Sequence, residues 1–158
     1  MTELQGRDAL GTLRIESRIA IDAPFEMVWK VTVGIADWPT WSPTVHAVQW
    51  LGGEPLTEGT RFRLKQPLQP SRLWQVTRLE PPVRAEWETI DIGPPFRAIH
   101  EVTPVADGTV SFLGLDAKRP RGILSPAAAL VLRTALAVEK RALRRRCLEM
   151  ANNQLGAP

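Results

Sequence analysis

The sequence has two histidines, His46 and His100, the side chains best suited to proton transfer near neutral pH. His100 lies in Ala-Ile-His-Glu-Val, where the alternation of a strand would put its imidazole on one face. A histidine that faces a cavity can act as a general acid or base near neutral pH. His100 is therefore the best catalytic candidate. The alternative for both histidines is a hydrogen-bonded or surface side chain.

The remaining reactive side chains favour structural roles. Glu86 and Glu88 flank Trp87, so strand alternation puts both glutamates on the face opposite the indole. If Trp87 faces the interior, both carboxylates face solvent, and a catalytic carboxylate pair is disfavoured. Cys147, the only cysteine, falls on an apolar helical stripe and is expected to be a buried structural thiol. Two distant histidines and one cysteine match no metal-ligand spacing, so no metal and no cofactor are expected.

The elements that must position these residues begin with a strand and two short helices. Residues 12–21 alternate between apolar and polar side chains and predict a half-buried strand. Residues 24–33 carry apolar side chains at helical spacing, and Gly34 should end that helix. Residues 35–41 predict a second short helical turn around Pro39. Six further strands separated by short turns are expected at 45–51, 60–65, 72–79, 84–91, 96–103 and 109–117.

The last quarter of the chain predicts one long amphipathic helix. It should begin after Ser125 and continue to about Asn152. Its apolar stripe comprises Leu132, Leu136, Leu143, Cys147 and Met150. The basic residues Arg133, Lys140, Arg141, Arg144 and Arg145 are expected to cover the rest of its surface. The apolar stripe must pack on the sheet, since no other large apolar surface is available.

Composition indicates an ordinary globular chain with an unusual aromatic content. The sequence has 158 residues, six Trp and no Tyr, which suggests one domain at 12–152 between an N-terminal segment, 1–11, and a tail, 153–158. The polar N-terminus shows no signal peptide and no run is long enough to span a bilayer. With a single cysteine, a reducing cytoplasm is the expected location.

The order of elements and several short motifs resemble the helix-grip superfamily. This group comprises the polyketide cyclase/dehydrase and lipid-transport proteins, START-like domains and the birch-pollen allergen, together called SRPBCC proteins. The matching segments are Ile19–Trp29, Asp37-Trp-Pro-Thr-Trp-Ser-Pro43, Gly59-Thr-Arg-Phe62, Trp74-Gln-Val76, Leu79-Glu-Pro-Pro82, His100–Pro104 and Asp107-Gly-Thr109. The resemblance covers roughly residues 12–150.

The resemblance implies an α+β helix-grip fold. In it, a curved seven-stranded antiparallel sheet wraps around the long C-terminal helix, with two short helices after the first strand. A cavity between sheet and helix would bind or transport a small hydrophobic or aromatic molecule. We expect the ligand to contact Trp41, Phe62, Trp74, Trp87, His100 and Phe112. Of the two tryptophans beside Pro39, Trp41 is expected to touch the cavity and Trp38 to pack outside it.

Two other functions stay open at this point. Some members of the superfamily cyclise or dehydrate polyketides, so His100 could move a proton in a cyclase or dehydratase. The segment 117–150 holds nine basic residues against two acidic ones, a net charge of +7, so a basic 118–146 surface could bind a macromolecule. Nucleic acid is disfavoured as a partner, because no base-stacking motif accompanies the charge. The sequence is compatible with a monomer or a homodimer.

Overall fold

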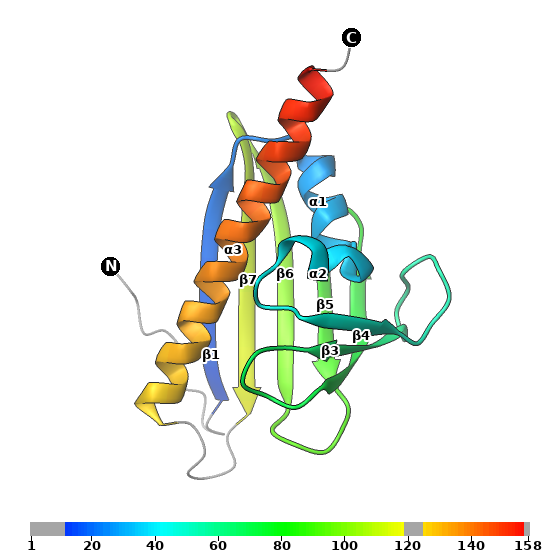
Figure 1. Ribbon diagram of the computed structural model, residues 1–158, viewed down its shortest axis with the longest axis vertical. Coiled ribbons are helices and arrows are strands. Elements are labelled where there is room, and N and C mark those ends of the chain that lie inside the picture. Colours follow the sequence, from blue (N-terminus) through cyan, green and yellow to red (C-terminus); the bar gives the residue numbers. More distant parts are fainter. Residues whose placement is uncertain (1–11, 119–124, 157–158) are drawn as a thin grey trace.

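The computed structural model describes residues 12–118 and 125–156, which form an α+β helix-grip fold (Figure 1). Its seven strands make one antiparallel sheet in the order β1-β7-β6-β5-β4-β3-β2. The strands are β1 (Thr12–Ile21), β2 (Ala47–Trp50), β3 (Arg61–Lys65), β4 (Arg72–Glu80), β5 (Arg84–Thr89), β6 (Phe96–Val105) and β7 (Gly108–Lys118). The predicted order of elements is confirmed, and the strand ends differ by a few residues.

The strand register decides which side chains face the helix. Trp87 pairs with Ala98, and His100 pairs with Leu113, so these residues share the inner face. Their neighbours along each strand point to the outer face, because successive strand residues alternate. Glu86 pairs with Ile99, and Glu101 pairs with Phe112, on that outer face.

The two short helices close one end of the sheet. Helix α1 (Phe25–Val33) buries Met27, Val28, Val31 and Thr32. A 3₁₀ turn, η1 (Ile35–Asp37), then leads into α2 (Trp38–Trp41). The indole Nε1 of Trp38 donates to the carbonyl of Thr32 at 3.2 Å. That carbonyl belongs to the last turn of α1, where carbonyls lack helical partners, so the bond fixes Trp38 against the end of the helix.

Helix α3 (Pro126–Leu155) lies mainly along β1 and makes a smaller contact with β7 (Figure 1). The hydroxyl of Ser125 caps it by accepting from the Ala128 N–H at 3.2 Å. Within the described residues, no helix is long and apolar enough to cross a membrane. The helix leans toward one edge of the sheet, so the inner face of the strands on the other side is left partly uncovered.

Apolar residues close both ends of the contact between α3 and the sheet. Ile15, Leu113 and Leu136 form a small cluster between β1, β7 and α3. At the α1 end, a second cluster contains Ile21, Met27, Val28, Val102, Leu143 and Cys147. The third and largest cluster fills the region under β3–β6 and includes Trp38, Phe62, Trp74 and Trp87.

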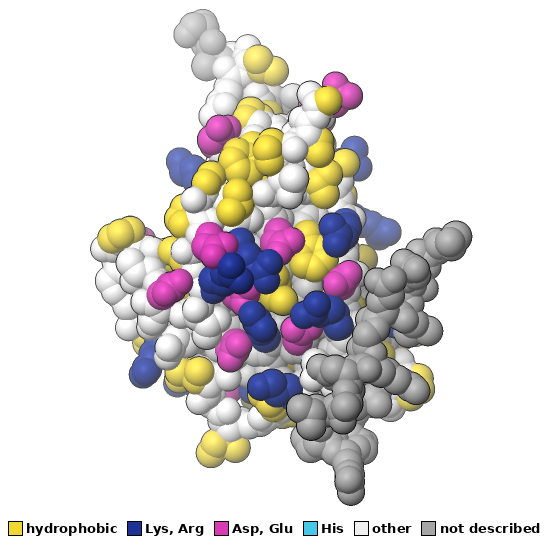
Figure 2. Space-filling model, turned by 180° about the vertical axis from the view of Figure 1, so that it is seen from behind, with side chains coloured by type: hydrophobic (Ala, Val, Ile, Leu, Met, Phe, Trp, Pro, Cys, Tyr) yellow, Lys and Arg dark blue, Asp and Glu magenta, His cyan; other side chains and the backbone are white. Residues whose placement is uncertain are grey.

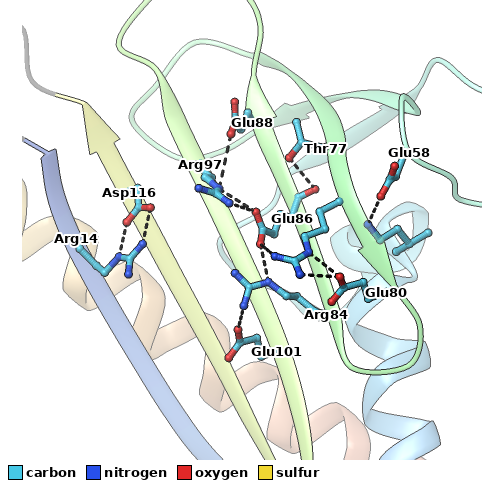
Figure 3. A network of polar contacts seen from close by, with 12 residues as sticks. Arg14, Glu58, Thr77, Glu80, Arg84, Glu86, Glu88, Arg97, Glu101 and Asp116 are labelled. Carbon is cyan, nitrogen blue, oxygen red and sulfur yellow. Dashed lines mark hydrogen bonds and ion pairs between the residues drawn. The ribbon is translucent and has the colours of Figure 1, made fainter.

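The outer face of the sheet carries interleaved basic and acidic side chains (Figure 2). Glu86 lies at their centre, and only 1% of its surface is exposed. Its carboxylate accepts from Arg84 Nε at 2.5 Å and Arg97 Nε at 2.9 Å (Figure 3). The Arg78 guanidinium lies 3.7 Å from the same carboxylate. Glu86 was expected to face solvent. It is on the expected face, but the long arginine side chains cover it.

Candidate functional site

A cavity of about 780 Å³ lies between the sheet and the first half of α3. This is within the usual range for small-molecule sites, roughly 300–1,000 Å³. The sheet contributes Leu64, Trp74, Trp87, Ala98, Leu113 and Leu115 to its walls, and α3 contributes Leu132, Ala135, Leu136 and Val138. These walls are apolar, so the cavity favours a ligand that is mostly hydrocarbon or aromatic.

One rim of the cavity presents exposed apolar side chains. Residues 66–69 of the β3–β4 connection form one side, and Leu68 among them is 97% exposed with a φ of 61°. Lys65 Nζ donates to the Gln69 carbonyl at 2.7 Å and ties the ends of this connection together. Across the cavity, Leu130 and Val131 of α3 are also exposed. The open rim of the cavity is therefore between this connection and the start of α3.

An ion pair holds the β5–β6 connection, residues 90–95, in place beside the cavity. Arg72 is buried and donates to the Asp91 carboxylate at 2.9 Å and to the Pro94 carbonyl at 3.0 Å. Its guanidinium also lies over the ring of Phe96, which lines the cavity. Burial opposes ionisation of Asp91, but hydrogen bonds from the Leu73 N–H and Arg72 outweigh it and lower the pKa of Asp91. The Arg72 guanidinium thus fixes this loop in place and lies behind the Phe96 side of the cavity wall.

Three rings form a continuous aromatic surface in the cavity. Trp87 lies 4.5 Å from His100, and Trp38 lies 5.7 Å from Trp87 and 6.0 Å from His100, measured between ring centroids. All three side chains are buried and line the cavity. A planar aromatic ligand could stack against or meet the edges of these rings.

The expected roles of Trp38 and Trp41 are reversed. Trp38 lines the cavity, whereas Trp41 packs between two core clusters beside α3. The Trp41 carbonyl also accepts a long hydrogen bond, 3.5 Å, from Arg145. The physical reason is the hydrogen bond from Trp38 to Thr32, which turns the Trp38 ring inward at the end of α1.

The other expected ligand contacts divide into two groups. Trp74, Trp87 and His100 line the cavity. Phe62 does not line it; its ring is buried in the core, between the rings of Trp50 and Trp87. Phe112 is on the opposite face of the sheet. Its ring packs over Gly114, where an added Cβ would come within 3.1 Å of it, and the Arg18 guanidinium lies 4.5 Å from the ring centroid.

A polar cluster that sequence reasoning missed lies beside His100. Lys140 is only 2% exposed, and its Nζ donates to Ser111 Oγ of β7 at 2.8 Å. Glu139 lines the cavity and accepts a weak hydrogen bond, 3.5 Å, from the buried Thr44 hydroxyl. The expectation that Lys140 covers the solvent side of the helix is wrong.

The sequence contains the signal that could have placed Lys140. It is four residues after Leu136, three before Leu143 and seven before Cys147, which is the spacing of the buried stripe. The prediction that Lys140 faces solvent followed the charge of the residue and not its position in the helical pattern. On a helix of 3.6 residues per turn, the position decides the direction of the side chain.

Burial shifts the proton affinities of this cluster. Burial, aided by the charge of Lys140, lowers the pKa of His100 well below its ordinary value, so the imidazole is neutral at pH 7. Burial also lowers the pKa of Lys140 to about 8, against the opposing effect of Glu139. The pKa of Glu139 is raised by burial, although Lys140 and Thr44 oppose the rise. Cys147 is buried and its pKa is raised to about 12, so its thiol is unreactive.

Two polar groups of the site have no hydrogen-bond partner among the described residues. His100 forms no hydrogen bond with any described residue, although it faces the cavity. The buried Nε1 of Trp74, whose side chain also lines the cavity, has no partner within the described part of the chain. His46 is exposed and lies outside the cavity. Among the described residues, no group of His, Cys, Asp or Glu is placed to hold a metal ion.

The fold and site together define a helix-grip protein with an internal apolar cavity. The family model for polyketide cyclase/dehydrase and lipid transport matches residues 12–147. The chain therefore belongs to this family. A search of curated protein sequences gives no match.

Solved structures support the fold. A START superfamily protein from Mycobacterium smegmatis aligns with a TM-score of 0.75 and 14% identity, covering 87% of this chain and 98% of that one. Ara h 8.0201 aligns with a TM-score of 0.68 and 13% identity over 88% and 99% of the chains. The di-domain ARO/CYC StfQ from the steffimycin biosynthetic pathway aligns with a TM-score of 0.71 and 14% identity. That alignment covers 92% of this chain and 52% of StfQ.

Proposed function

We propose that this protein binds a small, mainly apolar or aromatic molecule in the cavity between the sheet and α3. The observation that carries the proposal is the cavity itself, about 780 Å³ of space with mostly apolar walls. An apolar ligand in this space would cover those walls, and the removal of apolar surface from water is favourable. Family membership agrees with such a role.

The test combines detection of bound molecules with a change in the cavity. Native mass spectrometry of the purified protein should show a co-purified small molecule. Titration with a lipid and aromatic panel should change the tryptophan fluorescence, because Trp38, Trp74 and Trp87 line the cavity. The proposal fails if no mass co-purifies and no compound alters the fluorescence.

A matched pair of variants locates the binding site. Ala135 lines the cavity from α3, whereas Ala127 on the same helix is exposed and does not line it. Ala135→Trp should fill part of the cavity and weaken binding at least about tenfold, since the bulk of the indole occupies the space of the ligand. Ala127→Trp should leave the affinity unchanged. Equal affinities in the two variants would place the ligand elsewhere.

A second candidate function is a cyclase or dehydratase reaction. It is favoured by the position of His100, which faces the cavity as a neutral imidazole beside Glu139 and Lys140. A neutral imidazole can accept a proton from a bound substrate, and a polyketide-like chain held by the aromatic walls would be folded for reaction. His100→Gln should abolish turnover of synthetic polyketide thioesters followed by liquid chromatography and mass spectrometry. Turnover at the wild-type rate would remove His100 from the mechanism.

The third possibility is a macromolecule bound to the basic 118–146 surface. Fewer basic side chains are available on that surface than the sequence suggests. Lys140 faces the interior, and residues 119–124 lie outside the described part of the chain. The cytoplasmic location, and the choice between monomer and homodimer, remain predictions from the sequence.

A further inference from the structure

The cavity changes character along its length. On β6, Phe96, Ala98 and His100 line it in succession, starting beside the loop that Arg72 braces. The next residue on the same face, Val102, belongs to the cluster with α1, Leu143 and Cys147. His100 therefore marks the closed end of the cavity, and the apolar rim with Leu68 and Leu130 marks the open one.

A buried positive charge lies just beyond this closed end. Ser111 pairs with Val102, and Leu113 pairs with His100, so Ser111 is one step deeper on the same face. That step is about 7 Å along the strands. Lys140 donates to Ser111 there, and an ammonium has three hydrogens to donate. Lys140 forms no ion pair with any residue in the described ranges 12–118 and 125–156.

Its surroundings do not neutralise this charge. Ser111 on β7 offers a neutral hydroxyl, His100 on β6 is a neutral imidazole, and Cys147 on α3 is a protonated thiol. Glu139 is adjacent in sequence and its charge opposes the fall in the pKa of Lys140, but the two side chains form no ion pair, and the Glu139 carboxylate accepts from Thr44 instead. A buried ion without a counterion is unfavourable, so this end of the cavity favours an arriving negative charge.

We propose that the ligand carries an acidic oxygen group, a carboxylate or an ionised enol or phenol, at the end that lies beside His100. This inference rests on the proposed function, because it requires that the cavity binds a small molecule. The apolar or aromatic body extends toward Leu68 and Leu130. His100 donates a hydrogen bond to the acidic oxygen, and Lys140 acts from behind the lining by its charge. An amine in the same place would be repelled by Lys140.

Three naphthalene probes of one shape test this proposal by isothermal titration calorimetry at pH 7. They are 2-naphthoic acid, which is anionic, its neutral methyl ester, and 2-naphthylmethylamine, which is cationic. Wild-type protein should bind the acid at least about tenfold more tightly than the ester. The attraction between opposite charges about 7 Å apart in a protein interior exceeds the free energy that corresponds to a tenfold difference in affinity. The amine should bind most weakly.

Two charge-removing variants separate the buried lysine from the general positive charge of the helix. Lys140→Met should reduce the acid-to-ester preference to about one while leaving ester binding within about twofold, because the ester does not depend on the charge. Arg141→Met removes the exposed neighbouring charge and should keep the wild-type preference. Lys140→Gln, which retains a hydrogen-bond donor without charge, should behave as Lys140→Met and serves if the methionine variant does not fold.

The outcomes distinguish this inference from the proposed function. If wild-type protein binds acid and ester equally well, the cavity binds ligands but the acidic group is wrong. A preference that survives in both Lys140 variants also refutes it. If none of the probes binds and native mass spectrometry shows no ligand, the proposed function fails first and the inference falls with it.

Discussion

Lys140→Met should stabilise the protein at neutral pH. The folded state lowers the pKa of Lys140 from 10.5 to about 8. Holding the ammonium inside the fold at pH 7 therefore costs about 3 kcal/mol relative to the unfolded chain. Methionine has a similar length and no charge, but it leaves the Ser111 hydroxyl without its donor, at a cost of about 1–2 kcal/mol. The expected net gain in the free energy of unfolding is about 1–2 kcal/mol.

The pH dependence separates this explanation from an ordinary packing effect. Below about pH 8 the lysine is protonated in both states, and the full cost is present. Between about pH 8 and 10.5 the unfolded chain binds a proton that the folded one has released, so wild-type stability rises with pH relative to the variant. The advantage of Lys140→Met should thus shrink, or reverse, by pH 10.

Urea unfolding followed by tryptophan fluorescence at pH 7, 8.5 and 10 measures this difference. The exposed Arg141→Met variant is the control and should stay within about 0.5 kcal/mol of wild type at each pH. Other groups titrate in the same range, so the quantity to compare is the difference between Lys140→Met and wild type. A difference that does not change between pH 7 and 10 would refute a buried, charged lysine. Loss of stability in Lys140→Met at pH 7 would do so as well.

Three further predictions concern the scaffold. Glu86→Gln should lower the free energy of unfolding by about 2–3 kcal/mol at pH 7, because Glu86 is buried among arginines, while the exposed Glu88→Gln should cost under about 0.5 kcal/mol. The arginines lower the pKa of Glu86 despite its burial, so the deficit of the Gln variant should diminish as pH falls below 4.5, and a deficit independent of pH would contradict this. Gly108→Ala should lower the free energy of unfolding by more than about 2 kcal/mol, since its φ is 127° and the new Cβ would lie 2.4 Å from the Ile21 carbonyl oxygen. Gly53 has open space around it, so Gly53→Ala should be near neutral in the same urea assay. Cys147 should react with a thiol reagent only on unfolding, and rapid modification of the native protein would show that it is accessible.

The order of elements could be predicted because its signals are local, whereas the helix-grip arrangement was implied by the family resemblance. Strand alternation, Gly and Pro at the turns, and a Ser-Pro start to the last helix all agree with one order of elements. The long helix ends at Leu155 rather than Asn152, and the second strand is shorter than expected, which are ordinary errors at element ends.

The direction in which strand side chains point could be predicted only where one face of the strand is polar. Trp87 lies between Glu86 and Glu88, so its direction followed from alternation. Around Phe112 the residues on both faces of β7 are apolar or small, so the local pattern gives no direction for its side chain. The register with β6 resolves it by pairing Leu113 with His100, and pairing is a long-range property that the local sequence does not contain.

The errors at Trp38 and Lys140 have a common physical origin. In each case a polar atom found a partner distant in sequence or outside its own element, Thr32 for the indole N–H and Ser111 for the amine. Such a bond makes the burial of the attached polar group tolerable, and so it overrides the expectation from residue type. No periodicity analysis includes these partners, because they are brought together by folding.

Two departures from an ordinary apolar core occur side by side. One is the cavity of about 780 Å³, which keeps its apolar walls from packing on one another, and the other is the buried amine of Lys140 at its closed end. In a sequence whose local signals otherwise agree, such departures are expected at functional sites. A leucine at position 140 would match the stripe of Leu136 and Leu143 and would seal the core at no electrostatic cost. The same substitution would also remove the only feature proposed to orient a ligand in the apolar cavity, the charge of Lys140. The buried charge that destabilises the fold is therefore the same charge that is proposed to select an acidic ligand.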